Sequence, residues 1–129
     1  MPSSNYLRGK VIDGSLRSIN YTAPTTVFVS LHSSDPTANA TPASEVTGTW
    51  YTRQTVVFGA QSLAGQTANT NTITYNAVVN GPVTVTHFAV WDSQTLGNML
   101  YFGPLAATKT FSDTDVPSWL AGQIAIAAA

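Results

Sequence analysis

The clearest pattern along the chain is an alternation of apolar and polar residues from 83 to 92, VTVTHFAVWD. In an extended strand, Val83, Val85, His87, Ala89 and Trp91 fall on one face and the residues between them fall on the other. A turn-forming stretch, SQTLGN, follows, and MLYFGPL then runs back over 99–105. The sequence therefore predicts a β-hairpin that joins strands 83–92 and 99–105.

Five other segments carry a similar alternation, or the β-branched and aromatic residues that favour strands. They are residues 25–32, 50–59, 72–79, 107–111 and 121–128. Residues 60–71 are polar and contain glycine, which indicates a loop or a poorly ordered edge. The sum is about seven strands with turn signals about every 8–12 residues, the spacing of a sandwich or small barrel.

A helical pattern is confined to residues 4–18, SNYLRGKVIDGSLRS. Ser4 or Asn5 can cap its first turn. Four apolar residues fall near one face at helical spacing: Tyr6, Leu7, Val11 and Leu16. Gly9 and Gly14 weaken the pattern, because a glycine inside a helix costs about 1 kcal/mol relative to alanine. We therefore expect a short helix that depends on packing.

These patterns predict a mainly β fold, an antiparallel β-sandwich or small barrel of about seven strands with one short N-terminal helix. Helices do not alternate with strands along the chain, which argues against a parallel α/β fold. At 129 residues the chain can bury a core without extra cross-links, and it has no cysteine. We expect a single β domain over residues 1–129, with the helix at 4–18 and the strands within 25–128.

Charge content is unusually low and changes the picture of partners. Charged residues make up 9% of the chain, against about 25% in an ordinary soluble domain. A net charge of −1 gives no footprint for nucleic acid or acidic membrane, and no apolar run approaches the length of a transmembrane helix. Low charge favours a protein docked in a larger assembly; the alternative is a secreted β domain, although no signal peptide is seen.

Each of the two histidines is followed closely by an aspartate. His87 and Asp92 are five positions apart, and residues at an odd spacing in an unbroken strand point to opposite faces. His32 and Asp35 lie at a strand end, where Asp35 before a proline is typical of a capped turn. We interpret both histidines as structural and expect His87 to hydrogen-bond to a neighbouring strand. A metal or catalytic role stays open, but it needs further ligands by distant convergence.

Patterns of catalytic residues are missing from the sequence. It contains no G-x-S-x-G elbow, phosphate-binding loop or dinucleotide-binding glycine motif. Asp113 and Asp115 alternate in SDTDVP, which is typical of a solvated turn and leaves a weak cation site as the alternative. We therefore expect a protein that is not an enzyme and has no catalytic residues, cofactor or metal.

Candidate interface residues fall in two groups. Trp50, Tyr51 and Trp119 lie near turns, and tryptophan and tyrosine are enriched in interface hot spots; they could also stack on sugars. The apolar N-terminal helix and C-terminal strand could dock or form trimers, through Tyr6, Leu7, Val11, Ile124 and Ile126. Arg53 stands within a strand pattern, and we expect a structural ion pair with Glu45.

Several motifs together resemble a known family. They are TAP at 22–24, the L-x-x-x-D-P turn at 31–36, EVTG followed by YTRQ at 45–54, and THF followed by GNMLYFG at 86–103. The set resembles small virion proteins of tailed bacteriophages, often labelled tail fibre or minor tail proteins. HSSDP stands where that family commonly has F-T-A-D-P, and Trp50 stands in a glycine-rich position. The resemblance covers almost the whole chain and implies a structural virion component that is not an enzyme.

The position in the virion has two interpretations. Low charge, threonine-rich strands and the lack of a fibre repeat favour a capsid decoration (cement) protein, a class that usually forms trimers over the shell. The alternative is a tail fibre or minor tail protein, for which binding to host-surface glycans is a further option. The resemblance implies assembly in the bacterial host cytoplasm. The partners it implies are the major capsid protein or tail proteins, together with further copies of the chain, as in a trimer.

Overall fold

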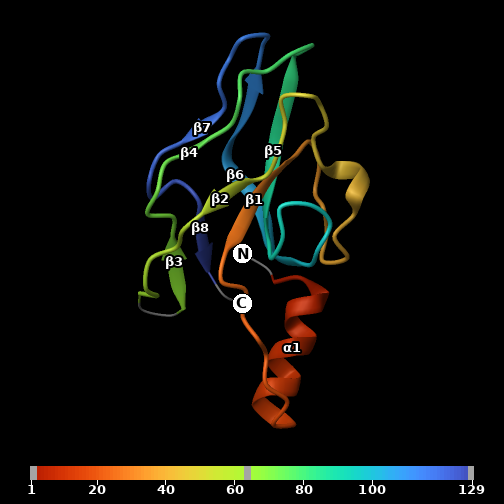
Figure 1. Ribbon diagram of the computed structural model, residues 1–129, viewed down its shortest axis with the longest axis vertical. Helices are drawn as coiled ribbons and strands as arrows, with labels where there is room; N and C mark the ends of the chain where they lie inside the picture. The colour runs from red at the N-terminus through yellow and green to blue at the C-terminus, as the bar shows by residue number, and fades with distance from the viewer. Residues whose placement is uncertain (1–2, 63–64, 128–129) are drawn as a thin grey trace.

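The computed structural model describes residues 3–62 and 65–127, and in these residues the chain is mainly β (Figure 1). One α-helix and eight strands are present, and every strand pair in the described part is antiparallel. The predicted fold class is confirmed, with eight strands among the described residues where about seven were expected. The sheets do not close into a barrel.

The largest sheet has four strands in the order β2-β1-β5-β6. They are β2 (Gln54–Val56), β1 (Val27–His32), β5 (Val83–Trp91) and β6 (Met99–Phe111). The predicted hairpin is confirmed as β5 and β6, which pair from Trp91 opposite Met99 to Val83 opposite Phe111. Residues 99–111 form one long strand, where the sequence predicted two.

A β-bulge interrupts the predicted alternation of β5. The register with β6 shifts between Val85 and His87, and an extra residue in one strand turns all later side chains to the other face. Val85 therefore shares a core cluster with Phe88, whereas Ala89 and Trp91 belong to a second cluster. The prediction of one face shared by 83, 85, 87, 89 and 91 was wrong for this reason.

Two small ribbons face the four-stranded sheet. The first pairs β3 (Gln66–Ala68) with β8 (Ala125–Ala127), and the second pairs β4 (Ile73–Thr74) with β7 (Ser118–Trp119). Figure 1 shows them together on one side of β1 and β2. The main core lies between ribbons and sheet, and its buried members come from both: Val29, Leu31, Val56, Val85, Phe88, Ile73, Tyr75, Trp119, Ile124 and Ile126.

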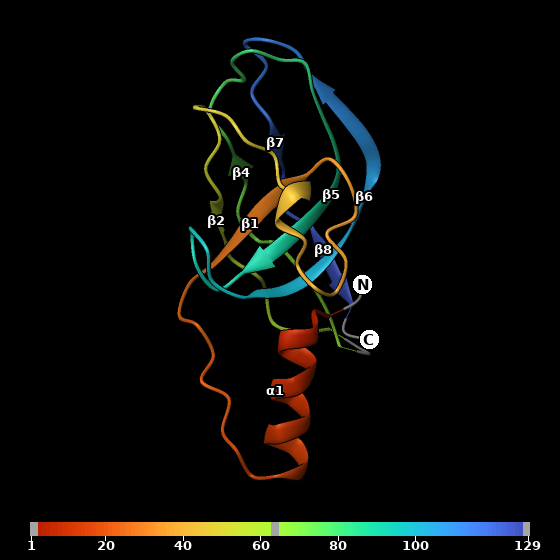
Figure 2. The same ribbon diagram turned by 90° about the vertical axis from the view of Figure 1, so that its right-hand side faces the viewer.

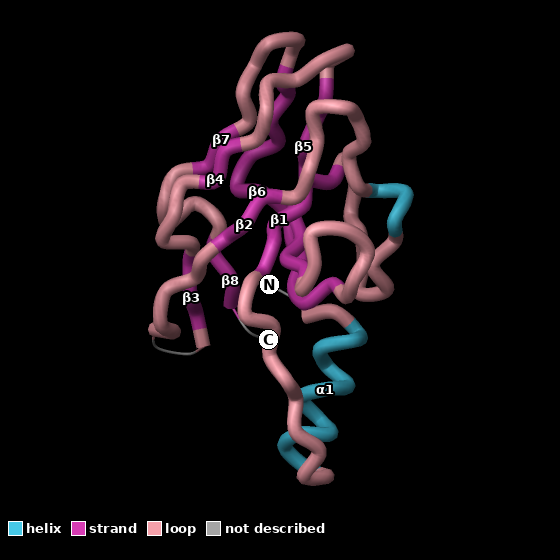
Figure 3. The backbone as a smooth tube through the Cα atoms, in the orientation of Figure 1, coloured by secondary structure: helices cyan, strands magenta, loops and turns pink. Residues whose placement is uncertain are grey.

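Helix α1 (Asn5–Leu16) projects from the end of the strand layers (Figure 2). The Ser4 side chain caps it by accepting from the Leu7 backbone N–H at 3.1 Å, as the sequence predicts. The helix ends at Leu16, two residues before the predicted end, and residues 17–26 run back beside it to β1 (Figure 3). None of the described helices is long and apolar enough to cross a membrane.

Candidate functional site

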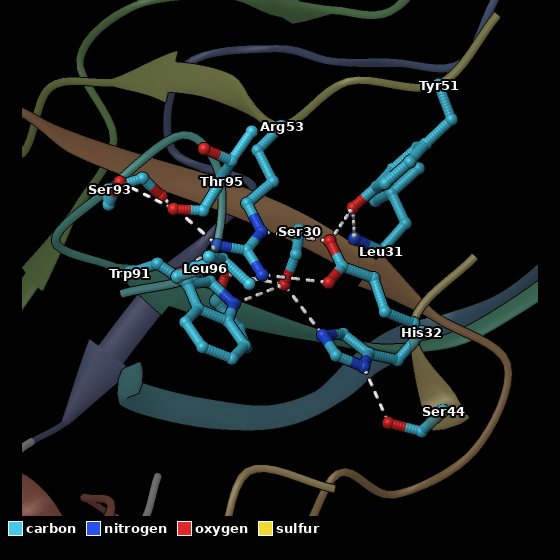
Figure 4. Close-up of polar contacts among 12 residues, drawn as sticks. Ser30, Leu31, His32, Ser44, Tyr51, Arg53, Trp91, Ser93, Thr95 and Leu96 are labelled. Atoms are coloured by element: carbon cyan, nitrogen blue, oxygen red, sulfur yellow. Dashed lines mark hydrogen bonds and ion pairs between the residues drawn. The ribbon is translucent and has the colours of Figure 1, made fainter. Parts of the chain in front are cut away.

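The densest polar cluster lies where the β5–β6 turn meets the start of β2, and Arg53 is its centre (Figure 4). Its guanidinium makes two bonds of 2.9 Å to the Glu45 carboxylate. A third nitrogen, Nη1, donates to the carbonyl oxygens of Ser93 (3.1 Å) and Leu96 (2.7 Å). The Arg53 Cζ lies 3.8 Å from the centre of the Trp91 ring. The predicted partners Arg53 and Glu45 therefore lie in contact, and Arg53 also holds the hairpin turn against the body.

Glu45 is kept charged by its neighbours despite its partial burial. Burial alone would raise the pKa of Glu45, but hydrogen bonds from Arg53 and Tyr51 hold that pKa below its ordinary value. The Tyr51 hydroxyl donates to Glu45 Oε2 at 2.6 Å and accepts from the Leu31 backbone N–H at 3.1 Å. Burial raises the pKa of Tyr51 well above its ordinary value, so the phenol stays a neutral donor to Glu45.

Trp91 links this cluster to a second buried network around Ser30. The indole Nε1 donates to Ser30 Oγ at 2.7 Å, and Ser30 Oγ lies 2.6 Å from His32 Nε2. On the other side of the ring, His32 Nδ1 lies 2.8 Å from Ser44 Oγ. Because Ser44 Oγ already donates to the Thr41 carbonyl at 2.9 Å, it accepts from Nδ1–H, and Nε2 accepts from Ser30.

His32 is therefore a neutral imidazole with the proton on Nδ1. Its side chain is fully buried, and burial lowers its pKa from 6.5 to about 4, against the opposing attraction of Glu45. An imidazole that is neutral, buried and bonded at both nitrogens holds β1 to the Ser44 turn. This geometry agrees with the interpretation of His32 as a structural histidine.

The side chains of Asp35, Asp92 and His87 each bond to a residue nearby in the sequence. Asp35 Oδ1 accepts from the Thr37 N–H at 2.8 Å, as expected of a capped turn. Asp92 accepts from the Asn98 backbone and side chain at 2.7 and 3.0 Å and so closes the β5–β6 hairpin. His87 lies opposite His32 in the sheet register, but its Nδ1 bonds Thr86 Oγ1 of its own strand at 2.8 Å. The expected bond to another strand is not found in the described residues.

The acidic turn also has a structural partner. Asp113 accepts from the Gly81 backbone N–H, and Asp115 Oδ2 accepts from the Ser112 N–H at 2.8 Å. Within residues 3–62 and 65–127, no group of three or more histidine and acidic side chains could hold a metal ion. The carboxylates are thus occupied in closing turns.

The interface candidates separate into buried and exposed sets. Four of the candidates are buried in the main core: Trp50, Trp119, Ile124 and Ile126. Leu7, in the first turn of α1, is also buried. Tyr6 and Tyr51 are partly exposed, and Val11 is exposed. The two buried indoles offer almost no ring face for a sugar or a partner. An interface role for the predicted set stays a prediction, which the exposed residues of α1 carry best.

Sequence reasoning missed two kinds of residue. Ser30 joins Trp91 and His32, but it lies 61 positions from Trp91, and no spacing rule connects them. Ile12 and Ile19 are exposed, as are Val11 and Leu16. The sequence-based prediction left out Ile12 because it assigned the apolar residues of the helix to a single face.

A cleft of about 690 Å³ lies over the Arg53 cluster, lined by Glu45, Tyr51, Trp91 and Leu96 among others.

The family model described as "Podophage GP4 fiber I protein gp80" matches residues 2–127. No curated protein matches the chain at a significant level.

Proposed function

The chain belongs to the podophage GP4 fiber I protein gp80 family, and from this premise we propose that it serves as a non-enzymatic fibre component of the phage tail. Membership in that family makes it a structural component of a phage virion. The observation that best supports a fibre role in the tail is the match over residues 2–127, because the matching family is named after a fibre protein.

The sequence favoured capsid decoration over the tail, and the family match supports the alternative better. Two structural features agree with a part that binds neighbours and does no chemistry. The polar cluster around Arg53 uses its donors on Glu45 and on the hairpin turn. Helix α1 projects from the body with apolar side chains in solvent. We propose other tail proteins and further copies of the chain as its partners.

Location and copy number in the virion test this proposal. An epitope inserted in the exposed turn at 112–116, away from α1, would be detected by gold-labelled antibody on intact particles. We expect label at the tail and a copy number of tens per particle by quantitative mass spectrometry. Label spread over the shell with hundreds of copies would overturn the fibre proposal and restore capsid decoration.

A deletion phage separates the two locations by phenotype. Loss of a fibre component lowers adsorption to host cells and leaves the heat stability of filled heads unchanged. Loss of a decoration protein does the opposite, because the shell loses its cement while the tail still binds. Complementation with the wild-type chain in the host controls for effects on neighbouring genes.

A further inference from the structure

The connection between β4 and β5 contains the one asparagine of the sequence that is followed by glycine, Asn80 before Gly81. Asparagine in this position is chemically vulnerable, because glycine has no side chain to keep its backbone nitrogen away from the asparagine amide. Asn80 is exposed and has a φ of 61°. No hydrogen bond of its side chain is found among the described residues. The amide of Asn80 is thus open to reaction.

The glycine of this pair is required by packing. A Cβ on Gly81 would meet the Phe111 carbonyl oxygen and a Val78 methyl group, each at 3.1 Å. A larger residue would therefore push the start of the β6–β7 connection away. Asn80 stands at a left-handed φ, a conformation that asparagine tolerates better than most other residues with a side chain. The turn therefore holds a vulnerable pair that its own geometry requires.

Asp113 binds the nitrogen that the reaction would use. The Gly81 backbone N–H donates to the Asp113 carboxylate, which lies 32 positions further along the chain in the β6–β7 connection. Figures 1 and 2 show this connection and the β4–β5 connection together at the end of the molecule away from α1. The nitrogen must lose its proton before it attacks the amide, and a carboxylate beside it disfavours a second negative charge. Asp113 therefore keeps the Gly81 nitrogen protonated.

We propose that Asn80 is a site of spontaneous deamidation and that Asp113 slows this reaction in the folded chain. The Gly81 nitrogen loses its proton and forms a bond to Asn80 Cγ, while the Cγ–Nδ2 bond breaks and ammonia leaves with the proton. Water then opens the resulting succinimide ring at one of its two carbonyl groups, which gives aspartate or isoaspartate. Water is the single co-reactant.

The product changes the charge of a chain that has few charges. The formal net charge of −1 and one new carboxylate give −2. The new carboxylate stands next to the Gly81–Asp113 bond, and like charges repel at this distance. The same corner is closed by two backbone bonds, from the Val78 N–H to the Asp115 carbonyl at 2.8 Å and from the Thr114 N–H to the Val78 carbonyl at 2.9 Å. A virion does not replace its proteins outside a host, so the change accumulates as the particle ages.

Peptide mapping by mass spectrometry on the full chain tests the proposal, because it assigns the loss of ammonia and the new carboxylate to one residue. At pH 8 and 37 °C we expect Asn80 to react faster in urea, where the turn is lost, than in the native chain. Asp113→Ala should raise the native rate about tenfold, since a carboxylate that shifts the proton equilibrium by about one pKa unit changes the deprotonated fraction tenfold. Circular dichroism checks that the variant stays folded.

Two further variants separate the charge of Asp113 from a general loosening of the turn. Asp115→Ala is the matched control, because Asp115 lies in the same turn but its Oδ2 accepts from the Ser112 N–H at 2.8 Å. It removes the same charge and should leave the rate at Asn80 close to that of the wild type. Asp113→Asn keeps an acceptor oxygen and the size of the side chain but loses the charge, so it should show most of the increase seen in Asp113→Ala.

Four results would contradict the proposal. No product at Asn80 in the unfolded chain would overturn the site itself. Equal rates at Asn80 in the native and unfolded wild-type chain, or in Asp113→Ala and Asp115→Ala, would overturn protection by Asp113. A slower reaction in Asp113→Ala would make the carboxylate a base that assists the reaction. None of these results bears on the fibre location, which immunogold labelling decides separately.

Discussion

Arg53 and Arg17 each pair with a carboxylate, and the two pairs lie in contrasting regions. In the body, Arg53 and Glu45 side chains are 7% and 18% exposed and share bonds with Tyr51 and the hairpin turn. On the stalk, which is α1 together with residues 17–26, the Arg17 and Asp13 side chains are 65% and 34% exposed. A chain with few charges thus uses one buried pair to fix its fold, and leaves the other pair largely exposed to solvent.

Removing the cation from each pair should give the largest difference between the regions. Arg53→Met leaves Glu45 without its main partner and frees the β5–β6 turn, so we expect a loss of about 3–5 kcal/mol in the free energy of unfolding. Arg17→Met is the matched control on the stalk, with an expected change of about 0–1 kcal/mol. Urea unfolding of both variants measures the difference, and similar losses would show that burial of the Arg53 pair does not matter.

Acid should weaken the body through His32. Its pKa falls from 6.5 to about 4 in the fold, so between these values the unfolded chain binds a proton that the folded chain does not. The free energy of unfolding therefore falls as pH falls through this window, by up to about 3 kcal/mol in all. The pKa of Glu45 is lowered from 4.5, so this carboxylate adds a further loss as pH falls below about 4.5. Urea unfolding at pH 7, 6, 5 and 4 measures the slope.

His32→Gln provides the control for this pH dependence. Glutamine cannot take up the proton, so the free energy of unfolding of the variant should fall much less between pH 6.5 and 4. The variant should also be less stable at pH 7, because the imidazole bonds to Ser30 and Ser44 are lost. An unchanged slope would place the titrating group elsewhere. The stalk has no histidine, so its helix signal should not change independently of the body across this range.

Loss of one hydroxyl in the body should matter more than loss of one on the stalk. Ser30→Ala leaves Trp91 Nε1 and His32 Nε2 without their shared partner, at an expected cost of about 2 kcal/mol. Ser15 on the stalk only bonds carbonyl oxygens of its own helix, at Val11 and Ile12, so Ser15→Ala should cost nothing or stabilise slightly. Thermal unfolding of the pair decides, and a neutral Ser30→Ala would mean that water replaces the hydroxyl.

The contrast also explains what the sequence could predict. The β5–β6 hairpin was predictable because a strict alternation and a turn signal lie within one short window. Strand β3 and the two-residue β7 were missed, since both are held by partners more than 40 residues away rather than by a pattern of their own. The bulge after Val85 was hidden for the same reason, because register is decided between strands.

The site divides in a similar way. Arg53 and Glu45 are eight residues apart and are the obvious opposite charges in their segment, so their contact could be predicted. Ser30 was not identified, because a serine in a strand gives no sign of whether its hydroxyl is buried. The faces of α1 were predicted wrongly when Tyr6, Leu7, Val11 and Leu16 were assigned to one side. In the structure Leu7 is buried, whereas Val11 and Leu16 are exposed together with Ile12.

The smallest effect on stability is expected at the far end of the stalk. Leu16 is 79% exposed, so Leu16→Ala should change the free energy of unfolding by less than about 0.5 kcal/mol. Leu7 on the same helix is buried against the body, and Leu7→Ala should cost about 2 kcal/mol or more. Measured together by urea unfolding at low protein concentration, the two leucines separate the part of α1 that serves the fold from the part that does not. A Leu16→Ala loss equal to that of Leu7→Ala would show that the stalk tip packs within its own chain, and the contrast between body and stalk would then end at Leu7.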